Sequence, residues 1–246
     1  MRRPGALPLH GSNTLDAVWL GLVPYQEAME IQRRVHREVI TGQRSHTLLL
    51  LEHPPVYTLG RRGGREHLHL SPDEVRHRGA EVVETDRGGL ITFHGPGQLV
   101  AYPIIHLGPR RSLRWFIRRL LDATAATANA LGVEDAVVDS DRPGVWVGPR
   151  KLASVGVRLT LGATLHGVAL NLDVDPAWFR DLSPCGLDVI ATSLVAEGAQ
   201  PVDAATAGAR LHAFLAAALG FECGRIALKK LERIRVCPYK EGCIVY

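Results

Sequence analysis

The feature that most constrains this fold is the shortness of its apolar segments and the spacing of the turn residues between them. Residues 144–159 read GVWVGPRKLASVGVRL, two strand-like runs separated only by Gly-Pro-Arg. Two runs this close in sequence pair antiparallel, because a parallel pair needs a crossover of a dozen or more residues. Residues 80–107 likewise divide into three short strands broken by glycines. The pattern therefore favours a mixed sheet over a doubly wound parallel one.

Helical segments separate the remaining strands. Pro24 begins a predicted helix that runs to about Ile40 with apolar residues four apart on one face. Ser112 is a suitable N-cap for the next helix, which Gly132 closes, and residues 202–220 form the last. The predicted fold class is α/β (α+β): a mixed β-sheet with flanking helices.

The length and composition indicate one folded domain. The chain has 246 residues and is 46% hydrophobic, which suffices for one sizeable core. We interpret residues 1–13 as a disordered lead-in, 14–220 as the catalytic domain and 221–246 as a C-terminal extension of unknown role. No apolar run approaches the ~20 residues that cross a membrane, and the N-terminus lacks the apolar core of a signal peptide. We therefore expect a cytoplasmic protein that does not enter a membrane.

The charged residues carry a more specific signal. The net charge of +4 weakly favours acidic partners, but the arginines are scattered, without the basic stripe typical of nucleic-acid binding. Lysine occurs at only four positions, three of them after residue 228, and the other basic residues are arginine. The isolated lysine is Lys151. It is either an ordinary surface residue or a group that must release its proton, which arginine cannot do in a protein.

Cys185 is the candidate nucleophile among four cysteines, none of which forms a C-x-x-C pair. Proline before it and glycine after it predict a tight turn that would fix the sulfur in space. A nucleophilic cysteine needs help in becoming a thiolate, and a desolvated Lys151 could remove its proton. The alternative is a buried structural cysteine, which is the commoner role of this residue type.

The glycine-rich stretch RGGLITFHGPGQLVAYPI, residues 87–104, predicts a ligand site without matching a nucleotide motif. The chain has no P-loop, and the G-x-G here lacks the third glycine of a dinucleotide fingerprint. Glycines let the backbone approach a ligand closely, and the apolar flanks suit an apolar ligand with one polar end. His94 and His166 are possible catalytic support residues or ordinary buried polar groups. No metal motif is present.

These segments together resemble the lipoyl(octanoyl) transferase family. The stretch 87–104 occurs with GVWVGPRKLASVGVRL, HGVALNLDVD and FRDLSPCG in that order, and LLLLEHPPVYTLGRRG precedes them. The resemblance covers roughly residues 15 to 220. It implies the mixed-sheet fold shared with biotin and lipoate protein ligases. It also implies a two-step transfer in which Cys185 is the nucleophile that carries the acyl group and Lys151 activates Cys185. It also implies an octanoyl pocket lined by Arg87, Gly88, Gly89, Leu90, Ile91, Thr92, Phe93, His94, Ser154, Val155, Gly156, Gly167, Val168 and Ala169.

The resemblance also implies the partners. The donor would be octanoyl-acyl carrier protein. The acceptors would be lysines of the lipoyl domains of 2-oxoacid dehydrogenases and of the glycine cleavage H protein. No cofactor is implied, since a thioester is already activated, and we expect a monomer. Three alternatives remain: an ATP-dependent lipoate or biotin ligase on the same fold, a non-catalytic binding domain, and a nucleic-acid-binding protein.

Overall fold

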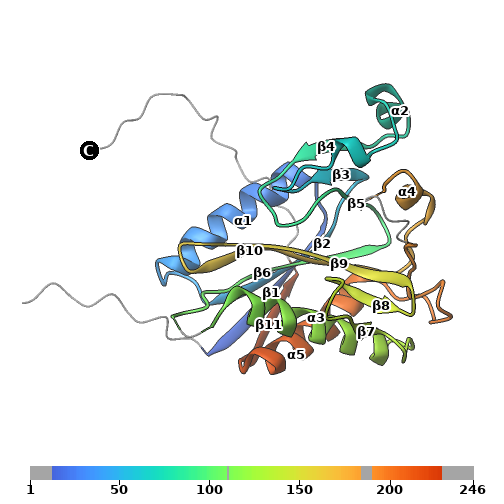
Figure 1. Ribbon diagram of the computed structural model, residues 1–246. Coiled ribbons are helices and arrows are strands. Elements are labelled where there is room, and N and C mark those ends of the chain that lie inside the picture. The colour runs from blue at the N-terminus through green and yellow to red at the C-terminus, as the bar shows by residue number, and fades with distance from the viewer. Residues whose placement is uncertain (1–12, 110, 184–189, 229–246) are drawn as a thin grey trace, which may run out of the picture.

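A large mixed sheet carries the molecule, with helices on both of its faces (Figure 1). The computed structural model describes residues 13–109, 111–183 and 190–228. The strands are β1 (Thr14–Leu22), β2 (His46–Glu52), β3 (Val56–Leu59), β4 (Glu81–Glu84), β5 (Thr92–His94), β6 (Gln98–Ile104), β7 (Val137–Val138), β8 (Val145–Val147), β9 (Arg150–Thr160), β10 (Ala163–Asn171) and β11 (Glu222–Leu228). The helices are α1 (Tyr25–Ile40), α2 (Pro72–His77), α3 (Leu113–Ala130), α4 (Ala177–Arg180) and α5 (Ala204–Leu219), with a 3₁₀ turn η1 (Arg65–His67).

The predicted mixed sheet is confirmed. Eight strands lie in the order β11-β1-β2-β6-β10-β9-β8-β7. The pairs β11–β1 and β1–β2 are parallel, and all the other neighbours in this sheet are antiparallel. The expected hairpin is the β8–β9 pair. β1 and β2 are parallel because α1 provides the crossover between them, as such a pair requires.

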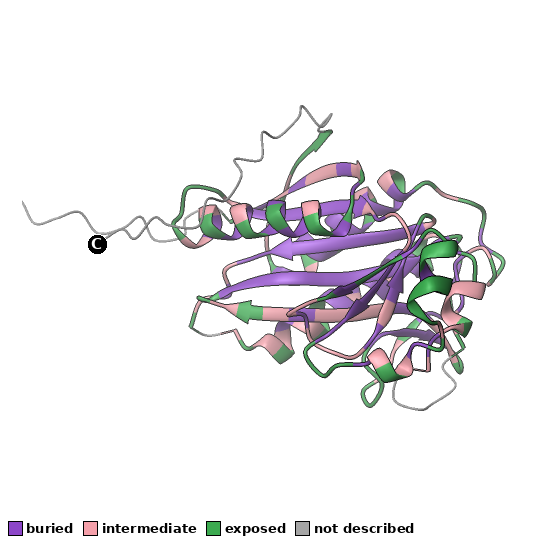
Figure 2. Cartoon of the chain, turned by 90° about the horizontal axis from the view of Figure 1, so that it is seen from above, coloured by how far each residue is buried: buried purple, intermediate pink, exposed green. Residues whose placement is uncertain are grey.

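Both faces of this sheet are covered, which is why its central strands are buried along their whole length (Figure 2). α1 packs on one face through Ala28, Ile31, Val35 and Val39. α3 and α5 pack on the other face, where they form the larger core. Strands buried on both sides appear in sequence as continuous apolar runs rather than alternating ones, and LLLL in β2 is an example.

A second, smaller sheet lies beside one end of the large one, in the order β4-β3-β5 (Figure 1). Pro54 and Pro55 end β2, and the chain then enters β3 in the small sheet. Tyr57 and Phe93 form the centre of its core and pack against α4. The two sheets together place the glycine-rich segment 87–97 against β9 and β10.

The predicted helix boundaries agree closely with the structure. The hydroxyl of Ser112 caps α3 by accepting a hydrogen bond from the backbone N–H of Trp115. α3 ends at Ala130, and Gly132 follows with φ of 104°. β11 extends the sheet at its edge beside β1, so the chain beyond residue 220 begins as part of the large sheet. None of the helices in the described part of the chain has the length and apolarity of a membrane span.

Candidate active site

A cavity of about 210 Å³ opens between the two sheets, along β9 and β10. β9 contributes Lys151, Ser154, Val155 and Gly156, and β10 contributes His166 through Ala169 together with Asn171. The segment between β4 and β6 closes the opposite wall. Of the residues expected to bind substrate, those lining the cavity are Arg87, Gly89, Leu90, Ile91, Thr92, His94, Ser154, Val155, Gly156, Gly167, Val168 and Ala169.

Gly88 and Phe93 do not line the cavity. Successive side chains of a strand point to opposite faces, so Thr92 and His94 in β5 face the cavity while Phe93 points into the core of the small sheet. There its ring stacks on Trp178 with 4.7 Å between ring centroids. Gly88 instead provides a backbone carbonyl that accepts a hydrogen bond from Arg87.

Two glycines allow the walls to approach closely. A Cβ on Gly167 would overlap the carbonyl oxygen of Ala101 in β6 and lie 2.7 Å from Cδ of Pro103. A Cβ on Gly156 would lie 2.8 Å from the carbonyl oxygen of Gly88 and 3.2 Å from Cδ of Arg87. Glycine at position 167 therefore lets β10 lie close to its neighbour β6, and glycine at position 156 lets Arg87 lie across β9.

Lys151 lies at the start of β9, where backbone pairing fixes its position. Its N–H donates to the carbonyl of Ile190 at 2.8 Å, and its own carbonyl accepts from the N–H of Thr192 at 2.9 Å. The Nζ atom lies 5.3 Å from the centroid of the Trp146 ring. A Cβ on Gly144 would lie 2.6 Å from the carbonyl oxygen of Ala153 and 2.9 Å from the Lys151 Cε, and its φ of 148° also favours glycine at this position beside Lys151.

A line of buried side-chain hydrogen bonds, here called the polar relay, connects the cavity to this strand pairing. His94 Nδ1 lies 2.6 Å from Gln98 Oε1, and Gln98 Nε2 donates to Asn171 Oδ1 at 2.8 Å. Asn171 Nδ2 then donates to the carbonyl of Thr192 at 2.8 Å. With Gln98 Oε1 as acceptor, His94 must carry its proton on Nδ1. Burial lowers the pKa of His94 to about 3, so the ring is neutral at pH 7.

A second buried histidine lies behind the first. His53 Nδ1 is 2.7 Å from the carbonyl of Val23, which makes that nitrogen the donor. Its Nε2 then accepts from the hydroxyl of Tyr102 at 2.8 Å. Burial lowers the pKa of His53 to about 4. Tyr102 lines the cavity and His53 supports it from behind.

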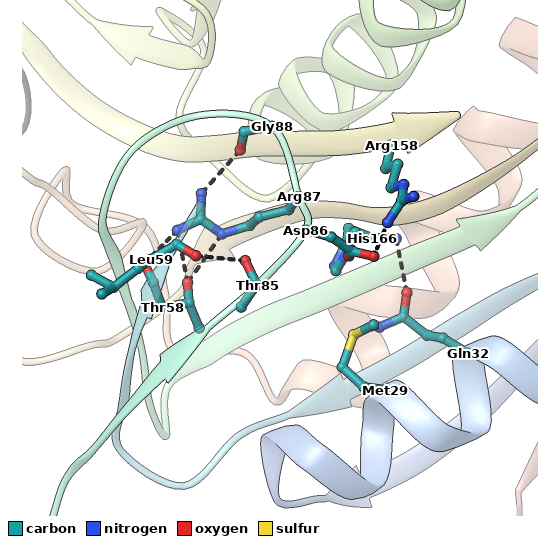
Figure 3. A network of polar contacts seen from close by, with 10 residues as sticks. All are labelled: Met29, Gln32, Thr58, Leu59, Thr85, Asp86, Arg87, Gly88, Arg158 and His166. Atoms are coloured by element: carbon teal, nitrogen blue, oxygen red, sulfur yellow. Dashed lines mark hydrogen bonds and ion pairs between the residues drawn. The ribbon is translucent and has the colours of Figure 1, made fainter. Parts of the chain in front are cut away.

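Arg87 is a buried cation held by neutral groups (Figure 3). Its guanidinium donates to the hydroxyl and carbonyl of Thr58 and to the carbonyl of Gly88. No described carboxylate lies within ion-pair distance of it. Burial lowers its pKa, although arginine stays charged in proteins. Arg87 therefore places in the cavity wall a positive charge that no carboxylate of the described residues pairs with.

His166 occupies an unusual backbone conformation with φ of 59°. Its N–H donates to Gln32 Oε1 at 2.8 Å, and its Nε2 lies 2.6 Å from Asp86 Oδ1 (Figure 3). Asp86 is also paired with Arg158. Partial burial opposes ionisation of Asp86, but His166 and Arg158 hold its pKa below the usual value. Burial lowers the pKa of His166 despite that carboxylate.

The sequence analysis missed several residues of the cavity. Tyr25, Tyr102 and Asn171 line it with polar groups, and Phe179 and Leu182 close it from the α4 side. Tyr25 begins α1 directly after Pro24, but its pattern is that of an ordinary amphipathic helix. Asn171 gave a clearer signal, as an amide that ends an otherwise apolar strand.

Cys185 lies outside the described residues, as do Cys237 and Cys243. Cys223 is exposed in β11, and its Sγ lies 3.5 Å from Nδ1 of His212, far in the topology from the cavity. Among the described residues, no three His, Cys, Asp or Glu side chains gather closely enough to hold a metal ion.

Comparisons with known proteins agree with this fold. Residues 24–216 match the lipoyl protein ligase A/B catalytic domain. An octanoyltransferase of Mycobacterium tuberculosis is 43% identical over 211 residues, covering 84% of this chain and 88% of that protein. An octanoyltransferase of Maridesulfovibrio salexigens is 42% identical over 174 residues, covering 70% and 81%.

Solved structures share the fold at low identity. Lipoate-protein ligase A bound with ATP has a TM-score of 0.70 at 15% identity, covering 86% of this chain and 89% of that one. The bipartite lipoate protein ligase of Thermoplasma acidophilum has a TM-score of 0.65 at 16% identity, covering 87% and 88%. The expected ligase-like fold is confirmed. The chain belongs to the lipoyl protein ligase A/B catalytic-domain family and, within it, to the octanoyltransferases, which are acyltransferase enzymes.

Proposed function

We propose that this enzyme moves an octanoyl group from octanoyl-acyl carrier protein to a lysine of a lipoyl domain, through a thioester on Cys185. The observation that carries the proposal is the cavity beside Lys151, in a chain whose relatives at 41–43% identity are octanoyltransferases. The acceptors would be the lipoyl domains of 2-oxoacid dehydrogenases and the glycine cleavage H protein.

The cavity walls suit an alkyl chain. Val100, Val155, Val168 and Ala169 supply apolar surface on the sheet side, and Leu90 and Ile91 supply it opposite. Burying the six methylenes of an octanoyl group would contribute about 5 kcal/mol, at ~0.8 kcal/mol each. Binding of that size holds the chain while its reacting end lies near Lys151.

In the first step, the amine of Lys151 takes the proton of the Cys185 thiol. The thiolate attacks the carbonyl carbon of the donor thioester, and a new C–S bond forms as the bond to the carrier sulfur breaks. The departing thiolate receives the proton from the Lys151 ammonium.

In the second step, the neutral amine of the acceptor lysine attacks the acyl-enzyme. A C–N amide bond forms and the C–S bond to Cys185 breaks. Lys151 takes the proton that the amine loses and returns it to the Cys185 sulfur. The cycle consumes neither water nor a nucleotide.

The placement of Lys151 supports its role in both steps. The described chain on the two sides of Cys185 is anchored, because Ser183 N–H donates to the carbonyl of His67 and the Ile190 carbonyl accepts from Lys151. Cys185 lies between these anchors in sequence. Lysine suits this position because, unlike arginine, it can alternate between charged and neutral forms.

The test is transfer to a purified lipoyl domain, measured by its gain of one octanoyl mass. We expect transfer from octanoyl-acyl carrier protein without ATP, and none to a lipoyl domain whose acceptor lysine is arginine. Transfer that requires ATP and free octanoate would instead support a ligase. That alternative shares the fold but rests on neighbours of only 15–16% identity.

A further inference from the structure

The indole of Trp146 lies next to Lys151 on the cavity side of the large sheet. Trp146 is the middle residue of β8, and its neighbours Val145 and Val147 belong to the core that α3 and α5 cover. Successive side chains of a strand point to opposite faces, so the indole points to the other face. Trp146 pairs with Lys151 across the hairpin, and paired residues project their side chains to one side.

A β-bulge in β9 turns Lys151 to that same face. Val145 pairs with Ala153 and Trp146 pairs with Lys151, so Leu152 is an extra residue on β9. In a regular strand Lys151 and Ala153 would share a face. The extra residue interrupts the alternation, and Lys151 lines the cavity while Ala153 stays in the core.

The indole is held in place by contacts other than Lys151. Trp146 is only 4% exposed, and its Nε1 donates to the carbonyl of Arg142 at 2.9 Å. The Arg142 guanidinium lies 4.2 Å from the ring centroid and is paired with Asp139 at 2.6 Å. The N–H of Asp141 and the side chain of Arg142 keep the pKa of Asp139 below its usual value, so this pair stays ionised at pH 7. The ring is therefore a fixed surface against which Lys151 lies.

This surface attracts only one of the two protonation states of Lys151. Nζ lies over the ring at 5.3 Å from its centroid, within the ~6 Å range of a cation–π interaction. The negative face of the ring attracts an ammonium and not a neutral amine. Because the indole is buried, the interaction belongs to the stronger, desolvated kind, and it favours the charged form of Lys151 by about 5- to 30-fold.

We propose that Trp146 is a positioning residue of the transfer reaction, whose ring stabilises the ammonium that Lys151 becomes when it takes the thiol proton. This role rests on the proposed function. In that step the S–H bond of Cys185 breaks, its electron pair stays on the sulfur, and the proton forms a new N–H bond on Nζ. The ring does not line the cavity, so it acts through Lys151 and not on the substrate.

The direct test measures the charge on Lys151 without the transfer reaction. Acetic anhydride acetylates only the neutral amine. Its rate of reaction with Lys151 across a pH series, read by peptide mass spectrometry, therefore gives the midpoint at which the ammonium loses its proton. Full-length Cys185→Ala is the parent protein, so that no thiol titrates together with the amine.

Removal of the ring should lower this midpoint. Trp146→Leu should lower it by about 0.7 to 1.5 pH units, which corresponds to the 5- to 30-fold preference. Trp146→Phe keeps an aromatic face and should lower it by less than half as much. Both variants lose the hydrogen bond from Nε1, so their difference isolates the ring. Equal midpoints in Trp146→Leu and its parent would overturn the proposal.

Two further variants guard against a structural explanation. If Trp146→Leu does not fold, Trp146→Met removes the ring and fills the space with a flexible side chain. Trp115 on α3 is the matched control, because Arg111 and Arg119 lie 5.2 and 6.0 Å from its ring centroid and it does not line the cavity. Trp115→Leu should leave the midpoint of Lys151 unchanged.

None of these variants replaces another charged group on the elements around Lys151. Those groups include Arg142 with Asp139, Arg150 with Glu197, and Arg62 in the cavity wall. A lowered midpoint in Trp146→Leu alone is therefore an effect of the ring.

Activity separates this role from the proposed function. With octanoyl-acyl carrier protein as donor and Cys185 in place, Trp146→Leu should lower kcat/KM about 5- to 30-fold, and Trp146→Phe should restore most of it. A lowered midpoint with unchanged kcat/KM would overturn the role of Trp146 in transfer and leave the proposed function intact. If the wild-type enzyme transfers no octanoyl group while Trp146→Leu still lowers the midpoint, the proposed function fails and the effect of the ring on Lys151 stands.

Discussion

Asn171 is the central member of the polar relay, and its replacement by leucine tests whether the relay stabilises the site. The change keeps the approximate volume of the side chain but removes both of its hydrogen bonds. Gln98 Nε2 retains only a 3.4 Å contact with the carbonyl of Phe93. The carbonyl of Thr192 loses the amide that holds it beside Lys151.

The magnitude follows from the two buried partners. Each unsatisfied group costs about 1–3 kcal/mol, so Asn171→Leu should lower the free energy of unfolding by about 2–6 kcal/mol. For a chain of this size, 1 kcal/mol shifts Tm by about 2–4 °C. Scanning calorimetry should therefore show a Tm at least about 4 °C below that of the wild type. Transfer should also slow, because the pairing partner of Lys151 is no longer fixed.

Two comparison variants sharpen this test. Asn13→Leu makes the same change at an exposed position and should alter stability by no more than about 0.5 kcal/mol. Asn171→Asp keeps the acceptor for Gln98 but directs a second oxygen at the carbonyl of Thr192. That contact raises the pKa of the new carboxyl, so its destabilisation should be small near pH 4 and grow as pH rises. Equal stability of Asn171→Leu and Asn13→Leu would refute the reasoning.

Three further predictions address the base, the cavity wall and the buried histidines. Lys151→Arg should slow transfer at least 100-fold, because the charge remains but the removable proton is lost. The loss should be about as large as in Lys151→Ala. A fully active arginine variant in a steady-state assay would show that charge alone matters. Gly167→Ala should destabilise the fold by about 3 kcal/mol, because its Cβ overlaps the carbonyl of Ala101. Gly148→Ala has open space around its Cβ and only a positive φ to strain it, so it should cost about 1–2 kcal/mol. Urea titration of the two variants measures both losses, and equal losses would contradict the steric argument. The pKa of His53 is lowered to about 4 in the folded protein, so as pH falls the imidazole takes up its proton in the unfolded chain before it does so in the folded one. The free energy of unfolding should therefore fall by roughly 3 kcal/mol as pH drops from 6.5 to 4. The same pH dependence in His53→Gln would contradict this.

Local patterns in the sequence predicted the elements well because the signals were local. Pro24, Ser112 and the Gly-Pro-Arg turn each act on adjacent residues, and each lies at the predicted boundary. The strand order was not predictable in the same way. It depends on which apolar faces cover one another, which no short window of sequence contains.

The cavity residues were predictable from the sequence where glycines let the backbone form the wall. They were less predictable where side chains from other elements complete it. Gly156 and Gly167 mark close approaches of the backbone, and both line the cavity. Phe93 was expected in the same wall, but it does not line the cavity, in keeping with the alternation of side chains along β5. Tyr25 reaches the cavity from a different element, so only the tertiary fold brings it there.

The central claim is that Cys185 carries the acyl group, and intact-protein mass spectrometry tests it most directly. The enzyme is mixed with octanoyl-acyl carrier protein without an acceptor domain and quenched in acid. The account predicts a gain of one octanoyl group that hydroxylamine removes, present in Cys223→Ala and absent in Cys185→Ala. An adduct that persists in Cys185→Ala, or no adduct in an enzyme that still transfers octanoyl to the lipoyl domain, would contradict it.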